Sequence, residues 1–455
     1  MATLQTYDIR PSMNFQALPT QEEWFALSPM DLFNTQNYST HALFFKLDDA
    51  DKPHIVDVFR RGLENTLGQC RHMAGTVQKR EDGTYGILKT PESRVRLDVR
   101  RLDDVSAIHP SYADIQKANF SASSLGDPAD WTIEGMTMSC RRFPDKSPPM
   151  SAFQLNIIRG GLVFTVHKHH AALDIAGTTS LVRQIAKNCA SIYHGLEPPR
   201  WDEGLMDRSR FTADKSPAAM VDPPLAPGRH PDWHPCSWLL FHLPRSKAAK
   251  LKDLCSPQDG TWISTHDAIA AYLWRVLLRR RAEIYKPDLT APALYCEAIN
   301  MRSRHFAEAP SVGDVISNAP LSWLAGFIRR VTTSATQEKL EKTLEMLAPV
   351  RDKWLMLPQL NALPPTSLVV TDWRGARMCD TDFGFGRPAA FRQLSDTVLE
   401  NMVVIYPPAP GLQDSFPDQG LELMVPFERH AINDLIRDPD MLRYFEFRGI
   451  EACPP

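Results

Sequence analysis

The hydrophobic residues of this chain follow two different periods, and together they predict a mixture of strands and helices. Short apolar runs predict strands at 40–47, 237–243, 293–299, 367–371, 402–406 and 421–427. Two further runs, FQLNII and LVFTV, are joined by Arg159, Gly160 and Gly161 and predict a β-hairpin over 153–166. Glycine supplies the positive φ that such a tight turn requires.

Apolar residues three and four positions apart predict three amphipathic helices. The first is marked by Ile55, Phe59, Leu63 and Leu67, and the second follows the hairpin with Leu181, Val182, Ile185, Cys189 and Ile192. The third is capped by Ser264 or Thr265 and carries Ile269, Tyr272, Leu273, Val276 and Leu277. Because strands and helices alternate in both halves, the predicted class is α/β with sheets of mixed direction.

A proline-rich segment divides the chain into two halves. Eight prolines lie between Leu196 and Pro235, and residues so placed support neither a helix nor a central strand. We therefore predict an N-terminal domain at 1–195, a linker at 196–235 and a C-terminal domain at 236–455.

Composition excludes several classes of protein. The chain has 455 residues, of which 43% are hydrophobic and 23% charged, and its net charge is -3, so nucleic acid is not an expected partner. No apolar run approaches the roughly 20 residues that cross a bilayer, and no secretory signal is evident at the N-terminus. The eight cysteines are scattered without a C-x-x-C pair, which predicts reduced thiols in a cytoplasmic protein and no zinc site.

Candidate chemistry begins directly after the hairpin, where His170 and Asp174 form an H-x-x-x-D pattern. A histidine on a loop after a strand is well suited to take a proton from an alcohol that attacks a thioester. The pattern alone is weak evidence, because a capping aspartate and a solvated histidine would look the same. His167 and His169 lack an acidic or cysteine partner at ligand spacing, so no metal is expected.

Two more segments strengthen the case for His170. They are DFGFGRP at 382–388 and NMRSR at 300–304, and Asp382 follows His170 by 212 residues. HxxxD and DFGxG in this order resemble the signature of the BAHD acyltransferases. Further segments resemble that family in order and context, most closely its fungal trichothecene 3-O-acetyltransferases: LSPMD, MAGTV, SWLLFHL, STHDAIAAYLW and VVTDW.

The resemblance implies a fold and an arrangement of domains. The expected fold is two-domain and chloramphenicol-acetyltransferase-like, each domain being a mixed sheet with flanking helices, with an active-site tunnel at their interface. A segment at 361–380 is expected to cross back to the N-terminal domain.

The resemblance also implies roles for individual residues. His170 is the expected general base, and Asp174 a structural aspartate paired with Arg302. Asp382 and Gly384 are expected to shape the domain junction. Contact with the acceptor or the oxyanion is expected from Thr371 and Trp373, and contact with coenzyme A from Lys247, Lys250, Ser264 and Thr265.

Three residues depart from the family pattern. Ile175 follows Asp174 where many relatives have glycine, Phe385 stands where plant members usually have tryptophan, and Asp372 occupies a place often filled by serine. The last change leaves the polarity of the acceptor site open. None of the three removes His170.

The expected function is an acyl-CoA-dependent O-acyltransferase of secondary metabolism. Acetyl-CoA or another acyl-CoA would be the co-substrate, a hydroxylated small molecule the acceptor, and no cofactor would be permanently bound. Transfer would be direct within a ternary complex, in a monomer. Two alternatives stay open: a protein of the same fold that binds or cyclises a polyketide or terpenoid, and a stand-alone condensation-type enzyme with a carrier-bound donor.

Overall fold

The computed structural model describes residues 3–452, apart from 13–21, 33–35, 105–107, 141–145, 203, 205–206, 208–210, 212–218, 300–306, 357–358 and 409–417. The chain forms two domains. The first contains Met1–Pro224, Leu347–Leu357 and Ala376–Thr397, and the second contains Leu225–Met346, Pro358–Gly375 and Val398–Pro455.

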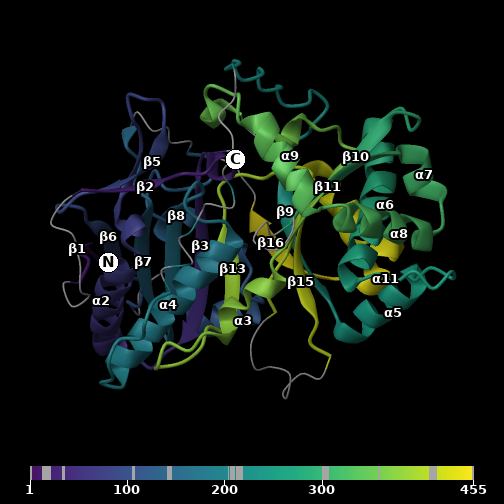
Figure 1. The fold of residues 1–455 in the computed structure, drawn as a ribbon. Helices are drawn as coiled ribbons and strands as arrows, with labels where there is room; N and C mark the ends of the chain where they lie inside the picture. Colours follow the sequence, from purple (N-terminus) through teal and green to yellow (C-terminus); the bar gives the residue numbers. More distant parts are fainter. Residues whose placement is uncertain are drawn as a thin grey trace. The chain divides into compact units, whose positions relative to one another are not determined.

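A six-stranded mixed sheet forms the centre of the first domain (Figure 1). Its order is β1-β6-β7-β8-β3-β13, and only β6 and β7 run parallel. The bounds are β1 Thr3–Ile9, β6 Val95–Arg101, β7 Ser151–Ile158, β8 Gly161–His169, β3 Tyr38–Lys46 and β13 Ala390–Leu394. The predicted hairpin is confirmed as β7 and β8, which turn at Gly160 with a φ of 68°.

Two long helices pack against each other and cover this sheet: α2 Lys52–Gln69 and α4 Ile175–Tyr193 (Figure 1). They approach closely because Gly62 has no side chain: a Cβ there would lie 2.5 Å from the Sγ of Cys189. The remaining elements are a three-stranded sheet and short helices: β2 Glu23–Ala26, β5 Tyr85–Lys89, β4 Thr76–Lys79, α1 Pro29–Leu32, α3 Tyr112–Lys117 and 3₁₀ turns at 71–74, 122–125, 128–130, 353–355 and 378–380.

The segment that returns to the first domain differs from the one predicted at 361–380. Residues 368–372 form β12, which pairs in parallel with two strands of the second domain. The stretches that return to the first domain are Leu347–Leu357 and Ala376–Thr397, and in the second of them β13 pairs with β3. The predicted linker at 196–235 is likewise divided, at Pro224.

The second domain is built on a seven-stranded mixed sheet in the order β11-β10-β12-β14-β15-β9-β16. The predicted strands at 237–243, 293–299, 367–371, 402–406 and 421–427 are confirmed. The bounds are β9 Cys236–Leu243, β10 Pro292–Ala298, β11 Ala307–Val312, β12 Leu368–Asp372, β14 Met402–Ile405, β15 Leu421–Glu428 and β16 Glu446–Ala452.

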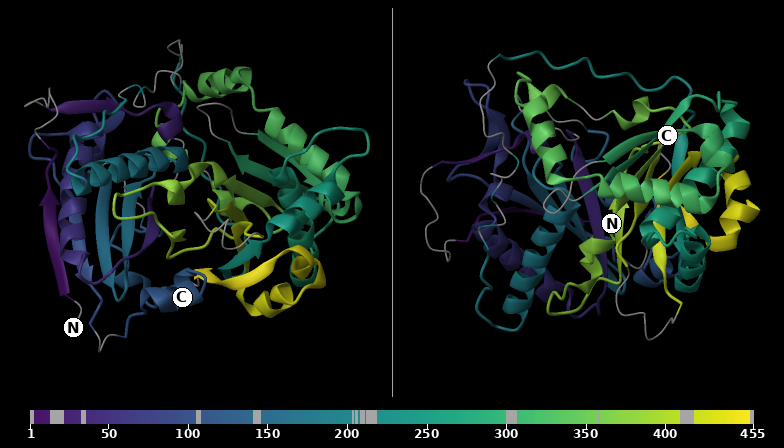
Figure 2. Two further views of the ribbon diagram at one scale, coloured as in Figure 1. Left: turned by 90° about the horizontal axis from the view of Figure 1, so that it is seen from below. Right: turned by 45° about the vertical axis from the view of Figure 1, so that its right-hand side comes forward.

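Helices of the second domain share one apolar core with this sheet (Figure 2). The central helix, α6, starts at a capping box in which Ser264 and Asp267 satisfy each other's backbone N–H groups. Its neighbours are α5 and α8. The bounds are α5 Arg245–Cys255, α6 Thr265–Tyr285, α7 Gly313–Asn318, α8 Leu321–Thr333, α9 Gln337–Leu347, α10 Ile432–Ile436 and α11 Pro439–Tyr444, with short 3₁₀ turns at 360–362, 374–376 and 429–431. Among the residues that the structure describes, no helix is long and apolar enough to cross a membrane.

We predict that Gly384→Ala destabilises the first domain. The φ of Gly384 is +91°, and a Cβ there would lie 2.8 Å from the Cα of Ala190 and 2.9 Å from the Cβ of Tyr193. Backbone strain and overpacking should together lower the free energy of unfolding by roughly 2–4 kcal/mol. Gly375→Ala is the matched control, since its Cβ meets open space. Equal melting temperatures for the two variants would contradict the prediction.

Candidate active site

The loop that carries His170 joins the end of β8 to the start of α4. The backbone N–H of His170 donates to the carbonyl of Asn37 at 2.9 Å, and that of Ala172 donates to the carbonyl of His169 at 3.0 Å. These bonds hold the turn against the edge of β3. The loop is therefore fixed at both of its strand contacts before any ligand binds.

Of the three clustered histidines, only His170 reaches the surface. His167 and His169 are completely buried, whereas His170 is partly exposed. The Nδ1 of His167 lies 3.0 Å from the Thr40 hydroxyl and 3.1 Å from the carbonyl of Met136. The ring of His169 stacks on Trp354. In the described part of the chain, no cluster of histidine, cysteine and acidic residues could hold a metal ion.

Electrostatics keep His170 uncharged. Burial, assisted by the positive charge of Lys168, lowers the pKa of His170 to about 3 against the opposing effect of Asp174. Among the described residues, the Nδ1 of His170 has no hydrogen-bond partner. A neutral imidazole offers one nitrogen lone pair, which is what a proton acceptor requires.

Lys168 is a buried cation that the sequence patterns did not reveal. Its side chain is almost completely buried, and its Nζ donates to the carbonyl oxygen of Leu173 at 2.6 Å, within the HxxxD loop. Burial lowers the pKa of Lys168 to about 8, while the carboxylate of Asp174 acts in the opposite direction. The only sequence signal was a lysine in an otherwise apolar strand end, between two histidines.

Asp174 begins α4. Its Oδ1 accepts a hydrogen bond from the backbone N–H of Gly177 at 2.7 Å, which is the usual contact of an N-cap aspartate. The expected partner, Arg302, lies outside the described residues. Asp174 can cap α4 and also pair with a cation, because the cap uses only one of its two carboxylate oxygens.

The DFG segment belongs to the core of the first domain. Phe383 is fully buried, and its ring contacts those of Phe45, Phe59 and Phe164. Asp382 accepts the backbone N–H of Gly384 at 2.8 Å and so shapes the turn. Asp382 and Gly384 thus fix the segment that leads into β13, and their expected effect on the domain junction stays a prediction.

Thr371 and Trp373 lie at the end of β12 in the second domain. The indole N–H of Trp373 donates to the Oγ1 of Thr371 at 2.9 Å. The indole donor is therefore already used, whereas the hydroxyl hydrogen of Thr371 stays available to a further acceptor. The expected contact of Thr371 and Trp373 with the acceptor or the oxyanion stays a prediction.

The residues expected to contact coenzyme A are dispersed around α5 and the start of α6. Lys247 forms an ion pair with Glu446 at 3.3 Å, and Lys250 is exposed. Ser264 uses its hydroxyl and its backbone N–H in the α6 capping box, and Thr265 is the first helical residue. Their contact with coenzyme A stays a prediction.

A buried cluster of charged groups lies beside the start of α6. His266 follows Thr265, and its ring nitrogens lie 3.2 Å from the Oδ2 of Asp372 and 2.9 Å from the Oε2 of Glu297. The cluster therefore connects the end of β12 to the helix start that carries Thr265. Glu297, a carboxylate within an apolar predicted strand, was the signal that could have revealed it.

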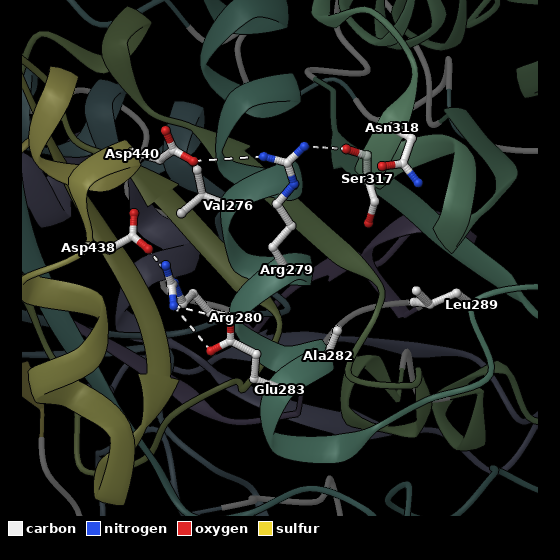
Figure 3. A pocket seen from close by; sticks show the side chains of 10 residues that line it. All are labelled: Val276, Arg279, Arg280, Ala282, Glu283, Leu289, Ser317, Asn318, Asp438 and Asp440. Atoms are coloured by element: carbon white, nitrogen blue, oxygen red, sulfur yellow. Dashed lines mark hydrogen bonds and ion pairs between the residues drawn. The ribbon is translucent and has the colours of Figure 1, made fainter.

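One pocket, of about 490 Å³, lies at the opposite end of α6 (Figure 3). Its two arginines are neutralised by carboxylates: Arg280 pairs with Asp438 and Glu283, and Arg279 pairs with Asp440. The third arginine of the run, Arg281, is buried and bonds Glu428 at 2.9 Å. These arginines are thus stabilised by specific ion pairs as well as by the helix dipole, which favours cations at the C-terminal end of a helix. A phosphate would meet three carboxylates here, so the pocket does not suit coenzyme A.

Comparisons with known proteins agree with this geometry. Residues 136–438 match the family model described as the transferase family, and residues 38–189 match the trichothecene 3-O-acetyltransferase-like N-terminal domain. The chain is 40% identical to acetyltransferase FGR3 of Gibberella zeae over 95% of this chain and 92% of that protein. It is 24% identical to trichothecene 3-O-acetyltransferase TRI101 of Fusarium sporotrichioides over 82% and 87% of the two chains.

A solved structure has the same fold. It is Fusarium graminearum TRI101 in complex with coenzyme A and deoxynivalenol, with a TM-score of 0.77, 20% identity, and coverage of 94% of this chain and 100% of that chain. The protein therefore belongs to the transferase family, and the predicted BAHD fold is confirmed. It is an acyltransferase, as the HxxxD and DFGxG motifs predicted.

We predict that Lys168→Met slows acyl transfer by roughly tenfold, because misplacing a reacting group costs rate. Methionine matches the length of the lysine chain but leaves the carbonyl of Leu173 without its donor. The measurement is the transfer rate at saturating substrates, with Lys187→Met on the exposed face of α4 as control. An unchanged rate for Lys168→Met would show that the ammonium is not needed to place the loop.

We predict that two variants distinguish the N-cap of Asp174 from its negative charge. Asparagine keeps an oxygen for the N-cap but loses the charge, whereas alanine loses both. Asp174→Ala should be less stable than Asp174→Asn by about 1 kcal/mol, and both should transfer acyl groups more slowly than the wild type. Denaturant unfolding and transfer rates measure the two effects. Two equally stable variants would argue against the cap.

Proposed function

We propose that the protein transfers an acetyl group from acetyl-CoA to a hydroxyl of a small secondary metabolite, with His170 as general base. The observation that carries the proposal is that His170, the one histidine of the three that is not fully buried, has a neutral imidazole and lies on a loop fixed by Asn37, Lys168 and the Asp174 cap. Its two neighbouring histidines are buried and unsuited to meet a substrate.

The proton follows a simple path in this mechanism. Neutral His170 takes the proton of the acceptor hydroxyl as the oxygen attacks the thioester carbon, and a tetrahedral intermediate forms. When the intermediate collapses, the imidazolium returns the proton to the departing thiolate of coenzyme A. A low pKa of His170 makes this imidazolium a strong acid, which favours the second step. No covalent acyl-enzyme is required.

We propose that residues of the second domain contribute to the binding of both substrates. The support for coenzyme A is that the related TRI101 structure holds it, and that Lys247, Lys250 and the start of α6 at Ser264 and Thr265 offer cations and backbone N–H groups. Lys247 would have to exchange Glu446 for a phosphate. On the acceptor side, the Thr371 hydroxyl, which accepts from Trp373, would donate to the acceptor or the oxyanion.

The proposed acceptor is a hydroxylated terpenoid. The support is the kinship with TRI101, whose solved complexes hold deoxynivalenol and T-2. The structural pairing of Asp174 with Arg302, the monomeric state and a cytoplasmic location stay predictions from the sequence.

We predict that His170→Ala abolishes acceptor-dependent release of free thiol from acetyl-CoA. The loss should be about 100- to 10,000-fold, the usual contribution of a general base. The assay uses purified protein, acetyl-CoA and a panel of hydroxylated terpenoids, and it follows both thiol and ester product. His194→Ala, an exposed histidine after α4, is the matched control.

The same assay discriminates between the alternatives. Binding of a terpenoid without thiol release by the wild type would indicate a binding protein or a cyclase. Transfer only from a carrier-bound acyl group would indicate a condensation-type enzyme. Equal thiol release by the wild type and His170→Ala would rule out His170 as the base.

A further inference from the structure

One imidazole joins three elements of the second domain. His266 is the second residue of α6, Glu297 lies near the end of β10 and Asp372 ends β12. The Nδ1 of His266 lies 3.2 Å from the Oδ2 of Asp372, and its Nε2 lies 2.9 Å from the Oε2 of Glu297. Since a carboxylate only accepts, a ring bonded to both must carry a hydrogen on each nitrogen and is an imidazolium.

The neighbouring charges balance only when His266 is protonated. Arg374 binds Asp372 through its Nε at 2.9 Å, and the hydroxyl of Tyr295 donates to Glu297 at 3.0 Å. Two carboxylates thus face two cations. The other charged groups at the start of α6 are Asp267 and, from α8, Arg329, which approach each other at 4.0 Å. A buried carboxylate that lost its cation would be strongly destabilised.

Asp372 lies in the chain between Thr371, whose hydroxyl is proposed to meet the acceptor, and Trp373, whose indole donates to that hydroxyl. Successive side chains of a strand point to opposite faces, so Asp372 anchors β12 from the face opposite to Thr371. Thr371 and Asp372 are consecutive in the backbone of β12, and the Thr371 hydroxyl accepts the indole N–H of Trp373 at 2.9 Å. The position of that hydroxyl therefore depends on how Asp372 is held.

We propose that His266 is a positioning residue for acyl transfer: its protonated ring holds Asp372 and, through it, the pair Thr371 and Trp373 in the productive arrangement. The inference rests on the proposed function, in which the Thr371 hydroxyl meets the acceptor or the oxyanion. It explains why a carboxylate is accommodated at position 372, where related acyltransferases often have serine.

The proposal predicts how activity depends on pH. Burial alone would lower the pKa of His266, but the hydrogen bonds to Asp372 and Glu297 outweigh burial and raise it to about 9. The folded-state pKa lies above the ordinary value of 6.5, so the bonding energy is fully present below pH 6.5 and is lost as pH rises through about 9. Activity should fall over that same interval.

The experiment measures kcat and KM for transfer from acetyl-CoA between about pH 6 and pH 10 in the wild type, His266→Gln and Asp372→Asn. The wild type should lose kcat in two steps: a first fall near pH 8, where Lys168 loses its proton in every variant, and a second with a midpoint near pH 9. His266→Gln should show kcat lowered by roughly tenfold at neutral pH, a nearly unchanged KM for acetyl-CoA and no second fall near pH 9. Asp372→Asn removes one carboxylate, so its alkaline limb should move to lower pH.

His430→Gln, an exposed histidine of the same domain, is the control and should keep the wild-type profile. His266→Gln can be compared only if it folds, which its melting temperature at neutral pH shows. If it does not fold, the pH at which kcat of Asp372→Asn falls still tests the role of His266. Unshifted alkaline limbs in the variants would overturn the role of His266 while leaving the transferase proposal intact. A wild type that transfers no acyl group at any pH would overturn the proposed function itself, and this inference with it.

Discussion

The chemistry proposed for this protein depends on buried charges that each face an opposite charge or a carbonyl oxygen. The ammonium of Lys168 is buried against the carbonyl of Leu173, in the loop that holds His170. The same cation disfavours a second positive charge nearby, which helps to keep the imidazole of His170 neutral. One buried contact thus serves both the shape of the loop and the protonation state of the base. In the second domain, His266 follows the opposite course, because two carboxylates stabilise its charged form.

In both domains, the polar residues proposed to act in transfer lie where a helix begins close to the ends of strands. In the first domain, β8 leads through the His170 loop into the Asp174 cap of α4. In the second, the Ser264 cap opens α6, and His266 connects that helix start to the ends of β10 and β12. Helix starts leave backbone N–H groups that need acceptors, so a capping carboxylate or hydroxyl is fixed in place by the backbone. Side chains beside such a cap are then held at low entropic cost.

A cluster of like charges in the sequence can be neutralised in the folded protein by partners from distant parts of the chain. The arginines at 279–281 lie where the dipole of α6 favours cations, and each also has an acceptor from another part of the second domain. The pocket beside them is consequently lined by balanced ion pairs. By contrast, the short segment from Ser264 to His266, which has no unusual composition, adjoins the polar residues of the proposed acceptor side. Membership of the transferase family and the burial of the other two histidines together support the proposal that His170 is the base.

The sequence by itself determined the local elements and the motifs. The period of the apolar residues located the strands β3, β9, β12, β14 and β15, the hairpin and the three long helices, because these depend on residues only a few positions apart. HxxxD and DFGxG identified the family for the same reason. Only the tertiary structure decided that β13 completes the first sheet, that Lys168 lies under the HxxxD loop, and that His266 meets carboxylates 31 and 106 residues away. Such contacts arise when strands distant in sequence become neighbours in a sheet, and no local pattern records which strands those will be.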